Sequence, residues 1–145
     1  MLMRGAYLNF HRRAQAHFSK HGVTADQYVL LAVLAEEENL TQKELTRRSY
    51  SDANTVTAML NRLEEKGLVE RRPCDRDRRA WRIHLTRRGR SLERTLQKHA
   101  AAFHSSLEKT LPAAHVDEIR AWFKRVIREM GSESTAAPRA KRKQG

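Results

Sequence analysis

The sequence lacks most of the features on which secreted, membrane-spanning and catalytic proteins depend. Its single cysteine, Cys74, excludes an internal disulfide and fits a reducing cytoplasm. The uncharged stretch of its most apolar predicted helix, residues 27–35, is far too short to cross a membrane, and residues 1–13 contain no apolar signal core. Six glycines are too scattered to form a phosphate-binding loop, and neither a nucleophile elbow nor a dinucleotide fingerprint occurs. We therefore expect a cytoplasmic protein that is not exported, does not span a membrane and is not an enzyme.

Apolar residues are also scarce, whereas positive charge is in excess. The hydrophobic fraction is 39% and the mean hydropathy is −0.77, which is lean for a self-sufficient globule and favours a dimer. The formal net charge is +12 and the sequence pI is 10.7. Such an excess indicates an anionic partner, either nucleic acid or an anionic membrane surface, and the motifs described next favour nucleic acid.

A short helix with a complete start signal is predicted from Gln42. Thr41 and Glu44 have the spacing of a capping box, in which each side chain bonds to the other residue's amide. Leu40 and Leu45 flank the cap at the spacing of a hydrophobic staple. The helix is interrupted two turns later by residues 49–51, Ser-Tyr-Ser.

A second helix follows this interruption, with Ser51 or Asp52 as its cap and Gly67 as its left-handed stop. Its apolar side chains recur at helical spacing at Val56, Met59, Leu60 and Leu63. The opposite face carries short hydrogen-bonding groups and one guanidinium, which suits the base edges of the major groove, although a solvated surface has the same pattern. The predicted contacts on this face are Asn54, Thr55, Thr57, Ala58, Asn61 and Arg62, and those at the preceding helix start are Thr41, Gln42 and Lys43.

Residues 68–72 and 80–86 predict two paired strands, because Trp81, Ile83 and Leu85 alternate with polar residues in the second strand. Residues 70–90 contain nine arginines against three carboxylates, a net charge of +6. A charge run is usually a solvated loop, but a like-charged hairpin tip repels itself and gains from an anionic partner such as phosphate. The predicted contacts at the tip are Arg76, Asp77, Arg78 and Arg79.

The order of capped helix, second helix and basic hairpin resembles the MarR family of bacterial transcriptional regulators. The family's wing signature, Asp-x-Arg followed by Leu-Thr-x-x-Gly, matches Asp77, Arg79, Leu85, Thr86 and Gly89. The turn at residues 49–51 differs, since the family usually has an apolar residue, a glycine and another apolar residue there. The resemblance implies a mainly α fold with a small β-hairpin wing, that is, a winged helix-turn-helix plus a helical dimerisation region. It also implies that Arg79 enters the minor groove, that Asp77 shapes the loop, and that aromatic acids or phenols bind near Tyr7, His11, Tyr28 and Trp81.

The flanking segments are amphipathic helices that suit the family's interlocked dimer, although a monomeric helical core would use the same apolar stripes. We predict helices over residues 2–19, 24–35, about 87–111 and from Pro112 to about 130. The predicted dimer contacts are Tyr7, Phe10, Phe103, Leu107, Trp122, Phe123 and Ile127. Residues 1–131 would form one domain, with residues 24–90 as the winged helix-turn-helix and residues 2–21 and 91–131 as the dimerisation part. Residues 132–145 are small, polar and basic, which predicts a disordered tail.

Two other groups of residues have features of a sensing site. His17 and His21 have the i, i+4 spacing of two metal ligands, but no further ligands cluster with them in the sequence, so we expect no metal and no cofactor. Cys74 lies beside Arg72 and Arg76, which would favour a thiolate, yet an unreactive thiol fits the same position. We expect a sequence-specific, nucleoid-associated homodimeric regulator of double-stranded DNA, a repressor at an inverted repeat that a small aromatic effector relieves. The alternative is a non-specific architectural nucleic-acid binder, which would need the arginines but not the polar helix face.

Overall fold

The computed structural model describes residues 1–74, 81–110 and 112–131, apart from the side chain of Leu107. The described residues cluster into two compact units, Met1–Phe103 and a second that begins at His104, and each is described by itself. The finer division at residues 24–90 stays a prediction, and the predicted tail at 132–145 lies outside the described residues. Every helix of the described residues is too short or too polar to cross a lipid bilayer.

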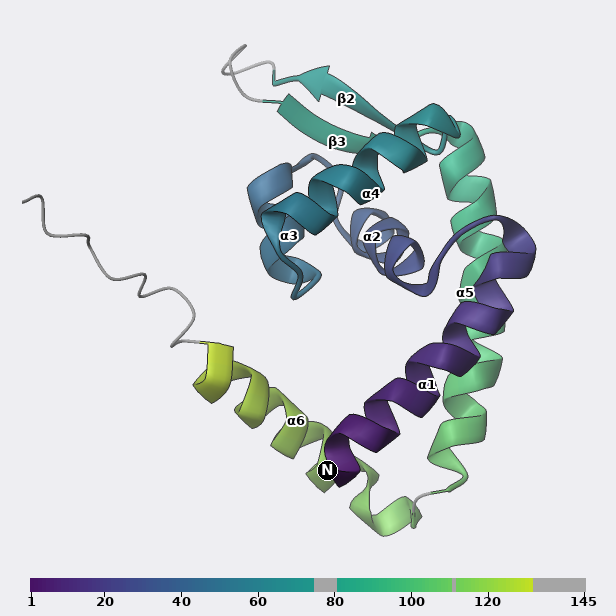
Figure 1. Ribbon diagram of the computed structural model, residues 1–145, viewed down its shortest axis with the longest axis vertical. Helices are drawn as coiled ribbons and strands as arrows, with labels where there is room; N and C mark the ends of the chain where they lie inside the picture. The colour runs from purple at the N-terminus through teal and green to yellow at the C-terminus, as the bar shows by residue number, and fades with distance from the viewer. Residues whose placement is uncertain (75–80, 111, 132–145) are drawn as a thin grey trace, which may run out of the picture. The chain divides into compact units, whose positions relative to one another are not determined.

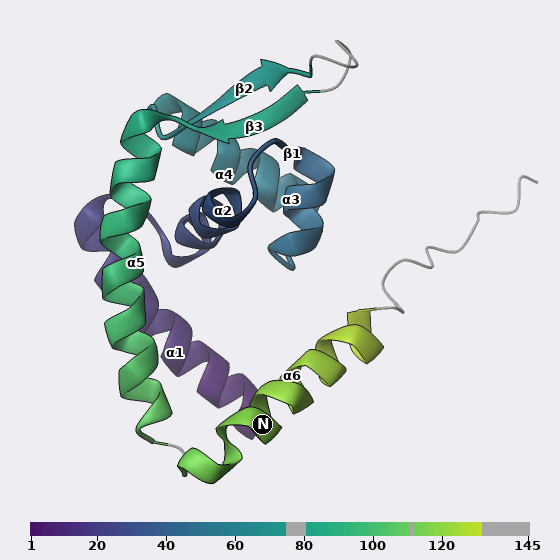
Figure 2. The ribbon, with the colours of Figure 1, turned by 180° about the vertical axis from the view of Figure 1, so that it is seen from behind.

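The fold is mainly helical with a small antiparallel sheet, as the sequence predicted, and its elements follow one another as shown in Figures 1 and 2. In the first unit they are α1 (Leu2–Phe18), the 3-10 turn η1 (Ser19–His21), α2 (Ala25–Glu36), β1 (Leu40–Thr41), α3 (Gln42–Arg48), α4 (Ala53–Glu65), β2 (Val69–Pro73), β3 (Trp81–Leu85) and most of α5 (Arg87–Glu108). The second unit contains the end of α5, the 3-10 turn η2 (Ala113–His115) and α6 (Val116–Gly131). Pro112 therefore caps a 3-10 turn, and the last helix begins after it, at Val116.

Side-chain caps fix where α2, α3 and α4 begin. In the predicted capping box of α3, the Glu44 amide donates to Thr41 Oγ1 at 3.2 Å and the Thr41 amide donates to Glu44 Oε2 at 2.7 Å. The same reciprocal pair joins Thr24 and Gln27 at the start of α2. Asp52, the second of the two predicted candidates, caps α4 by accepting from the Thr55 amide at 2.9 Å. All three caps satisfy helix amides that have no partner within the helix.

The turn between α3 and α4 contains no glycine, and a tyrosine occupies its left-handed position. Tyr50 has a φ of 51° and therefore occupies the left-handed region, which costs a residue with a Cβ roughly 1–2 kcal/mol. Its side chain is 75% exposed, so little packing compensates for the strain. The turn is closed by the Ser49 amide, which donates to the Leu45 carbonyl at 2.9 Å.

The sheet has three strands rather than the two that we predicted. Its order is β1-β3-β2, and both pairs are antiparallel, with Ile83 of β3 opposite Leu40 on one side and Arg71 on the other. The two-residue strand β1 has no periodicity of its own, so no sequence pattern marks it. Its pairing places the start of α3 directly beside the strand that leads out of the wing (Figure 2).

A single hydrophobic core joins these elements in the first unit. The apolar sides of α2, α4 and β3 contribute Leu31, Leu60 and Ile83, each 1% exposed or less. The partly buried side chains of Tyr28 and Phe103 pack against this core. The core therefore fixes the orientation of α4, whose other face is left at the surface.

The segment that follows β3 is tied to the end of α4 by a compact hydrogen-bonded junction. Gly67 ends α4 with a φ of 64°, as predicted, and the Thr86 hydroxyl donates to its carbonyl at 2.7 Å. The Thr86 amide donates to the Leu68 carbonyl at 3.1 Å, and the Thr86 hydroxyl caps α5 by accepting from the Gly89 amide at 3.0 Å. A Cβ on Gly89 would lie 1.9 Å from the Leu68 carbonyl oxygen, so only glycine fits this approach. This contact gives a physical reason for the Leu-Thr-x-x-Gly part of the wing signature.

Candidate nucleic-acid interface

The polar face of α4 lies at the surface, while its apolar face is buried. Val56 and Leu63 are 0% exposed and belong to the core, so they fix the rotation of the helix. The predicted contacts that are exposed are Asn54, Thr55, Ala58, Asn61 and Arg62. A helix held in this way presents one defined row of hydrogen-bonding groups to a partner.

Thr57 differs from the other predicted contacts because it is half-buried and its hydroxyl is engaged. The hydroxyl donates to the Ala53 carbonyl at 2.7 Å and accepts from Gln42 Nε2 at 2.6 Å. The bond from Gln42 links the first turn of α3 to α4. Thr57 therefore has only one remaining lone pair and a methyl group to offer a base, and Gln42 positions a helix in addition to any contact it makes.

The opposite end of α4 is joined to strand β2 through Arg71. One guanidinium nitrogen of Arg71 forms an ion pair with Glu64, and the other donates to Asn61 Oδ1 at 2.7 Å. The sequence had predicted Asn61 as a contact but gave no sign that Arg71 holds it, because the pair forms only when β2 folds back beside the helix.

Strand β3 is joined in turn to the start of α3. Arg82 donates to the Asn39 carbonyl at 2.8 Å and to Glu44 Oε2 at 3.3 Å. The pKa of the Glu44 carboxyl lies below its ordinary value because Thr41 donates to it through its hydroxyl and its amide, with a smaller contribution from Arg82. The ionised Glu44 carboxylate thus accepts hydrogen bonds both from Thr41, the cap of α3, and from Arg82 on β3.

The predicted wing contacts Arg76, Asp77, Arg78 and Arg79 lie outside the described residues. Of the remaining basic groups of this region, Lys43 and Arg47 are exposed on α3 and Arg62 on α4. Arg72 is exposed on β2, where it forms an ion pair with Glu70. These cations lie on α4 itself and on α3 and β2, two elements that pack against α4, an arrangement that suits a polyanion.

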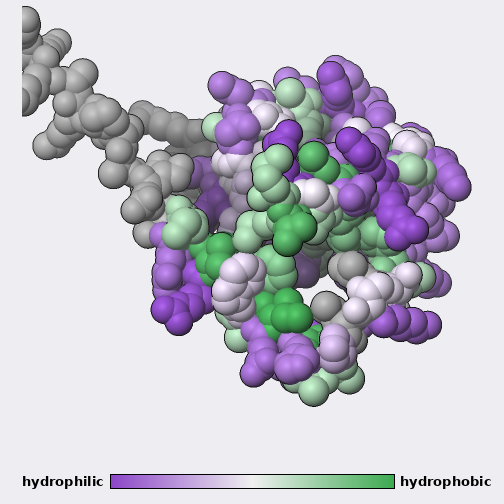
Figure 3. Space-filling view, turned by 60° about the horizontal axis from the view of Figure 1, so that its bottom comes forward, coloured by the Kyte–Doolittle hydropathy of each residue, from purple (hydrophilic) through white to green (hydrophobic). Residues whose placement is uncertain are grey.

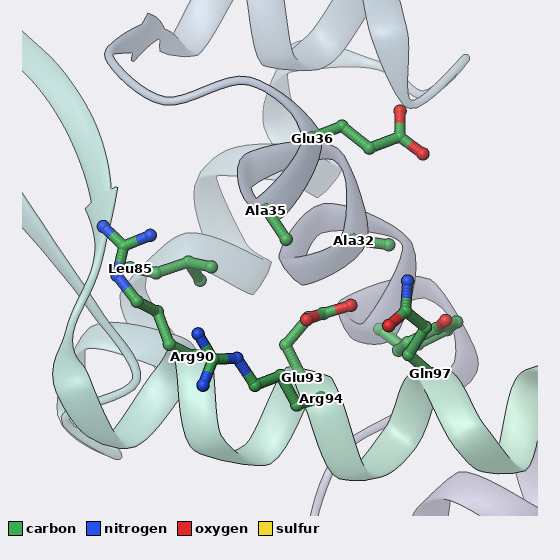
Figure 4. Close-up of a pocket in the computed structure, with 9 residues that line it drawn as sticks. Ala32, Ala35, Glu36, Leu85, Arg90, Glu93, Arg94 and Gln97 are labelled. Atoms are coloured by element: carbon green, nitrogen blue, oxygen red, sulfur yellow. The ribbon is translucent and has the colours of Figure 1, made fainter.

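A cavity of about 320 Å³ lies between α2, β3 and α5 (Figure 4). Of the four residues predicted to line a ligand pocket, Tyr28 lines this cavity, whereas Tyr7, His11 and Trp81 do not. Trp81 is 55% exposed at the end of β3, and His11 lies 3.3 Å from Asp26. The cavity lining consists of Tyr28, Ala32, Ala35, Glu36, Leu85, Arg90, Glu93, Arg94 and Gln97.

Glu93 gives the cavity a buried carboxyl group that sequence reasoning missed. It is 6% exposed, and burial raises its pKa above the ordinary value, with a further rise from Glu36 and an opposing effect of Arg94. The Tyr28 hydroxyl on the facing helix also has a raised pKa, first because of burial and then because of Glu93. A signal was present in the sequence, since Glu93 lies three residues before Leu96, on the apolar stripe of the helix.

His17 on α1 and His21 in the turn η1 lie close to a third histidine that the sequence did not associate with them. The ring of His99 on α5 lies 5.0 Å from that of His17 and 4.9 Å from that of His21, measured between centroids. Burial, followed by the neighbouring His99, lowers the pKa of His17, and its Nε2 has no hydrogen-bond partner among the described residues. No three potential ligands among the residues with described positions converge on a metal site.

The residues predicted for dimerisation fall into two groups. In the first unit, Phe10 and Phe103 contact each other with ring centroids 4.9 Å apart, and Tyr7 is exposed. In the second unit, Trp122 and Phe123 on α6 are each 49% exposed. Figure 3 shows hydrophobic residues, in green, at the surface among hydrophilic ones, in purple. Ile127 is likewise exposed on α6.

Comparison with known proteins gives a consistent result. Residues 23–81 match the model of the MarR family. Two curated relatives are the HTH-type transcriptional regulator TtmR of Methylorubrum extorquens and the organic hydroperoxide resistance transcriptional regulator of Bacillus subtilis. The first is 40% identical over 84 residues, which are 58% of this chain and 43% of the relative. The second is 39% identical over 74 residues, which are 51% of this chain and 50% of the relative. The chain thus spans about half the length of the curated relatives that it matches.

Solved structures resemble a larger part of the chain. Wild-type MarR from E. coli in its apo form is 28% identical, with a TM-score of 0.72 and coverage of 87% of this chain and 94% of the other. A cysteine-to-serine mutant of E. coli MarR complexed with operator DNA is also 28% identical, with a TM-score of 0.79 and coverage of 87% and 91%. The likeness therefore extends through the helices on both sides of the matched segment.

Proposed function

Because this chain belongs to the MarR family, we propose that it is a sequence-specific DNA-binding transcriptional regulator that acts as a homodimeric repressor in the cytoplasm, at the nucleoid. The observation that carries the proposal is the exposed polar face of α4, which the core holds in one orientation, together with the exposed cations on α3, α4 and β2. The solved relative with operator DNA, at a TM-score of 0.79, supports the same use of the fold.

Base reading by α4 is favoured over purely electrostatic binding because of what the helix exposes. Asn54 and Asn61 offer amide groups that distinguish base edges in the major groove, whereas an architectural protein needs only cations. The net charge of +12 adds an affinity for any DNA sequence, which weakens as salt increases. Specificity would therefore come from α4 and a large part of the affinity from the surrounding arginines and lysines.

Dimerisation is supported by the apolar surface of α6. Trp122, Phe123 and Ile127 are between 42% and 49% exposed, and burial of one large apolar side chain contributes about 1.5–3 kcal/mol. A second copy of the chain is the proposed partner for this surface. Two reading helices related by a two-fold axis would enter successive major grooves, so the proposed site is an inverted repeat with half-sites centred about 10 bp apart.

The cavity between α2, β3 and α5 is the proposed site for a small effector that relieves repression. Tyr28 on α2 and Glu93 on α5 both line it, and it adjoins β3, the strand that leads out of the wing. A ligand that changes the spacing of α2 and α5 would therefore act on α2, which packs against α4. An aromatic molecule is proposed because Tyr28 and the apolar side chains of Ala32 and Leu85 line the cavity.

Selection of bound sequences from a random DNA pool tests the proposal. We expect enrichment of one inverted repeat, and we expect Asn54→Ala to relax the base preference more than it lowers the salt dependence of binding. Asn9→Ala, which truncates an exposed asparagine on α1, is the matched control, and light scattering verifies that both variants keep the parental mass. Binding without enrichment of any sequence would instead identify an architectural nucleic-acid binder.

A further inference from the structure

Asn61 on α4 is held by a side chain from outside the helix. Arg71 on β2 donates to Asn61 Oδ1 at 2.7 Å and is itself anchored by an ion pair with Glu64, one helical turn from Asn61. A guanidinium group has donors and no acceptor, so the amide atom that faces it is the oxygen. The Asn61 amide is therefore oriented with its oxygen toward β2 and its NH2 group away from it.

This orientation changes what Asn61 offers to DNA. An unrestrained asparagine pairs with adenine by accepting from the amino group and donating to N7. At Asn61 the accepting oxygen is already bonded, and a second donor would approach it beside the positive charge of Arg71. The exposed NH2 group remains available, and it requires an acceptor. Guanine presents two acceptors at its major-groove edge, N7 and O6.

We propose that Arg71 is a positioning residue that sets base specificity, because it makes Asn61 a donor that selects guanine over adenine at one position of each half-site. The inference rests on the proposed function, in which α4 enters the major groove. It adds a residue of the wing strand to the set that determines sequence preference, although Arg71 itself is half-buried and paired within the protein.

The neighbouring residue on the same strand provides a matched control. Arg72 has the same chemistry, but adjacent side chains of a strand point to opposite faces, and Arg72 forms an ion pair with Glu70 instead of contacting α4. Loss of Arg72 should weaken binding to all sequences by a similar factor, because it removes a charge without freeing a base-reading group.

The experiment compares the sequences selected from one random pool by the parent, Arg71→Met and Arg72→Met proteins. For the parent we expect one guanine position per half-site, and for Arg71→Met we expect the guanine-to-adenine ratio at that position to fall about ten-fold. Arg72→Met should keep the parental ratio at every position. If the parent enriches an inverted repeat but Arg71→Met selects the same bases, this inference is wrong while the proposed function stands. If the parent enriches no sequence, both are wrong.

Two variants of Asn61 separate base reading from a general effect on folding. Asn61→Asp keeps the bond to Arg71 but removes the NH2 donor, so it should lose the guanine preference without losing thermal stability. In an Asn61→Ala background, Arg71→Met should cause no further change at that position, because the group that it orients is absent. An unchanged guanine preference in Asn61→Asp, or an equal effect of Arg71→Met in both backgrounds, would overturn the proposal.

Discussion

Replacement of Gly89 by alanine tests the junction between α4 and α5 directly. The added Cβ would lie 1.9 Å from the Leu68 carbonyl oxygen and 3.0 Å from its carbon, and both are backbone atoms. The obstructing atoms therefore cannot turn away as a flexible side chain would. To relieve the contact, the start of α5 must move away from β2, which would disturb the bonds of Thr86 to Gly67 and Leu68.

Two opposing contributions decide the sign of this change. Alanine is favoured over glycine within a helix by about 0.8–1 kcal/mol, so without a clash the variant would be more stable than the parent. Overpacking against fixed atoms costs about 1–3 kcal/mol and occasionally more. The difference between the two contributions is roughly 0–2 kcal/mol, and because the obstructing atoms are backbone we expect Gly89→Ala to lower the free energy of unfolding by an amount in the upper half of that range.

Urea unfolding, followed by circular dichroism at one fixed protein concentration, measures this difference. Gly5→Ala is the matched control, because Gly5 also lies in the first turns of a helix but has no atom within 4 Å of its added Cβ. It should gain up to about 1 kcal/mol from helix propensity. A Gly89→Ala protein as stable as Gly5→Ala would refute the reasoning, since it would show that α5 does not approach Leu68 so closely.

Three further predictions concern strained or buried groups. Tyr50→Gly should raise the free energy of unfolding by about 0.5–1 kcal/mol, because glycine adopts the left-handed conformation without strain and this gain exceeds the cost of the greater chain entropy of glycine in the unfolded state. Tyr50→Ala keeps a Cβ at this position and should give no gain in the same urea assay. The pKa of His17 is lower in the folded protein than its ordinary value of 6.5, so as the pH falls the unfolded chain takes up a proton at this residue before the folded protein does. The free energy of unfolding should therefore decrease as the pH drops below about 6.5. Thermal unfolding from pH 8 to pH 5 should show a smaller decrease in melting temperature for His17→Gln than for the parent. Burial raises the pKa of Glu93, so the protonated side chain contributes fully to the free energy of unfolding at low pH, and this contribution is lost as the pH rises through the pKa of the folded protein. Glu93→Gln should therefore increase the melting temperature at pH 7. The control Glu65→Gln, at an exposed position, should not.

The sequence predicted the parts of the fold that depend on local spacing. The capping box at Thr41 and the stop at Gly67 involve residues within one or two turns, so their geometry follows from the chain itself. Apolar periodicity likewise identified the buried face of α4 and therefore the exposed one. The family signature was also visible, and the structure gives a reason for its glycine at position 89.

The features that sequence reasoning missed depend on residues that meet only in the folded protein. Strand β1 exists because Leu40 pairs with Ile83, and His99 joins His17 because α5 packs beside α1. The contact of Arg71 with Asn61 requires the strand to fold back beside the helix that precedes it. The pattern of a single sequence gives the periodicity along the chain but not the distance between elements. For this reason, of the four residues expected to line the ligand pocket, Tyr28 alone lines the cavity.

The central place of β3 in the sheet also affects how this unit folds. Pairing of β2 with β3 joins neighbouring segments, but pairing of β1 with β3 brings Leu40 to Ile83 across two helices and a strand. Closure of a longer loop costs more chain entropy, and non-local contacts of this kind slow folding. We therefore expect α3 and α4 to form before β1 docks, so that the last step of folding is the one that brings Arg82 to the start of α3 and fixes β3 beside that helix.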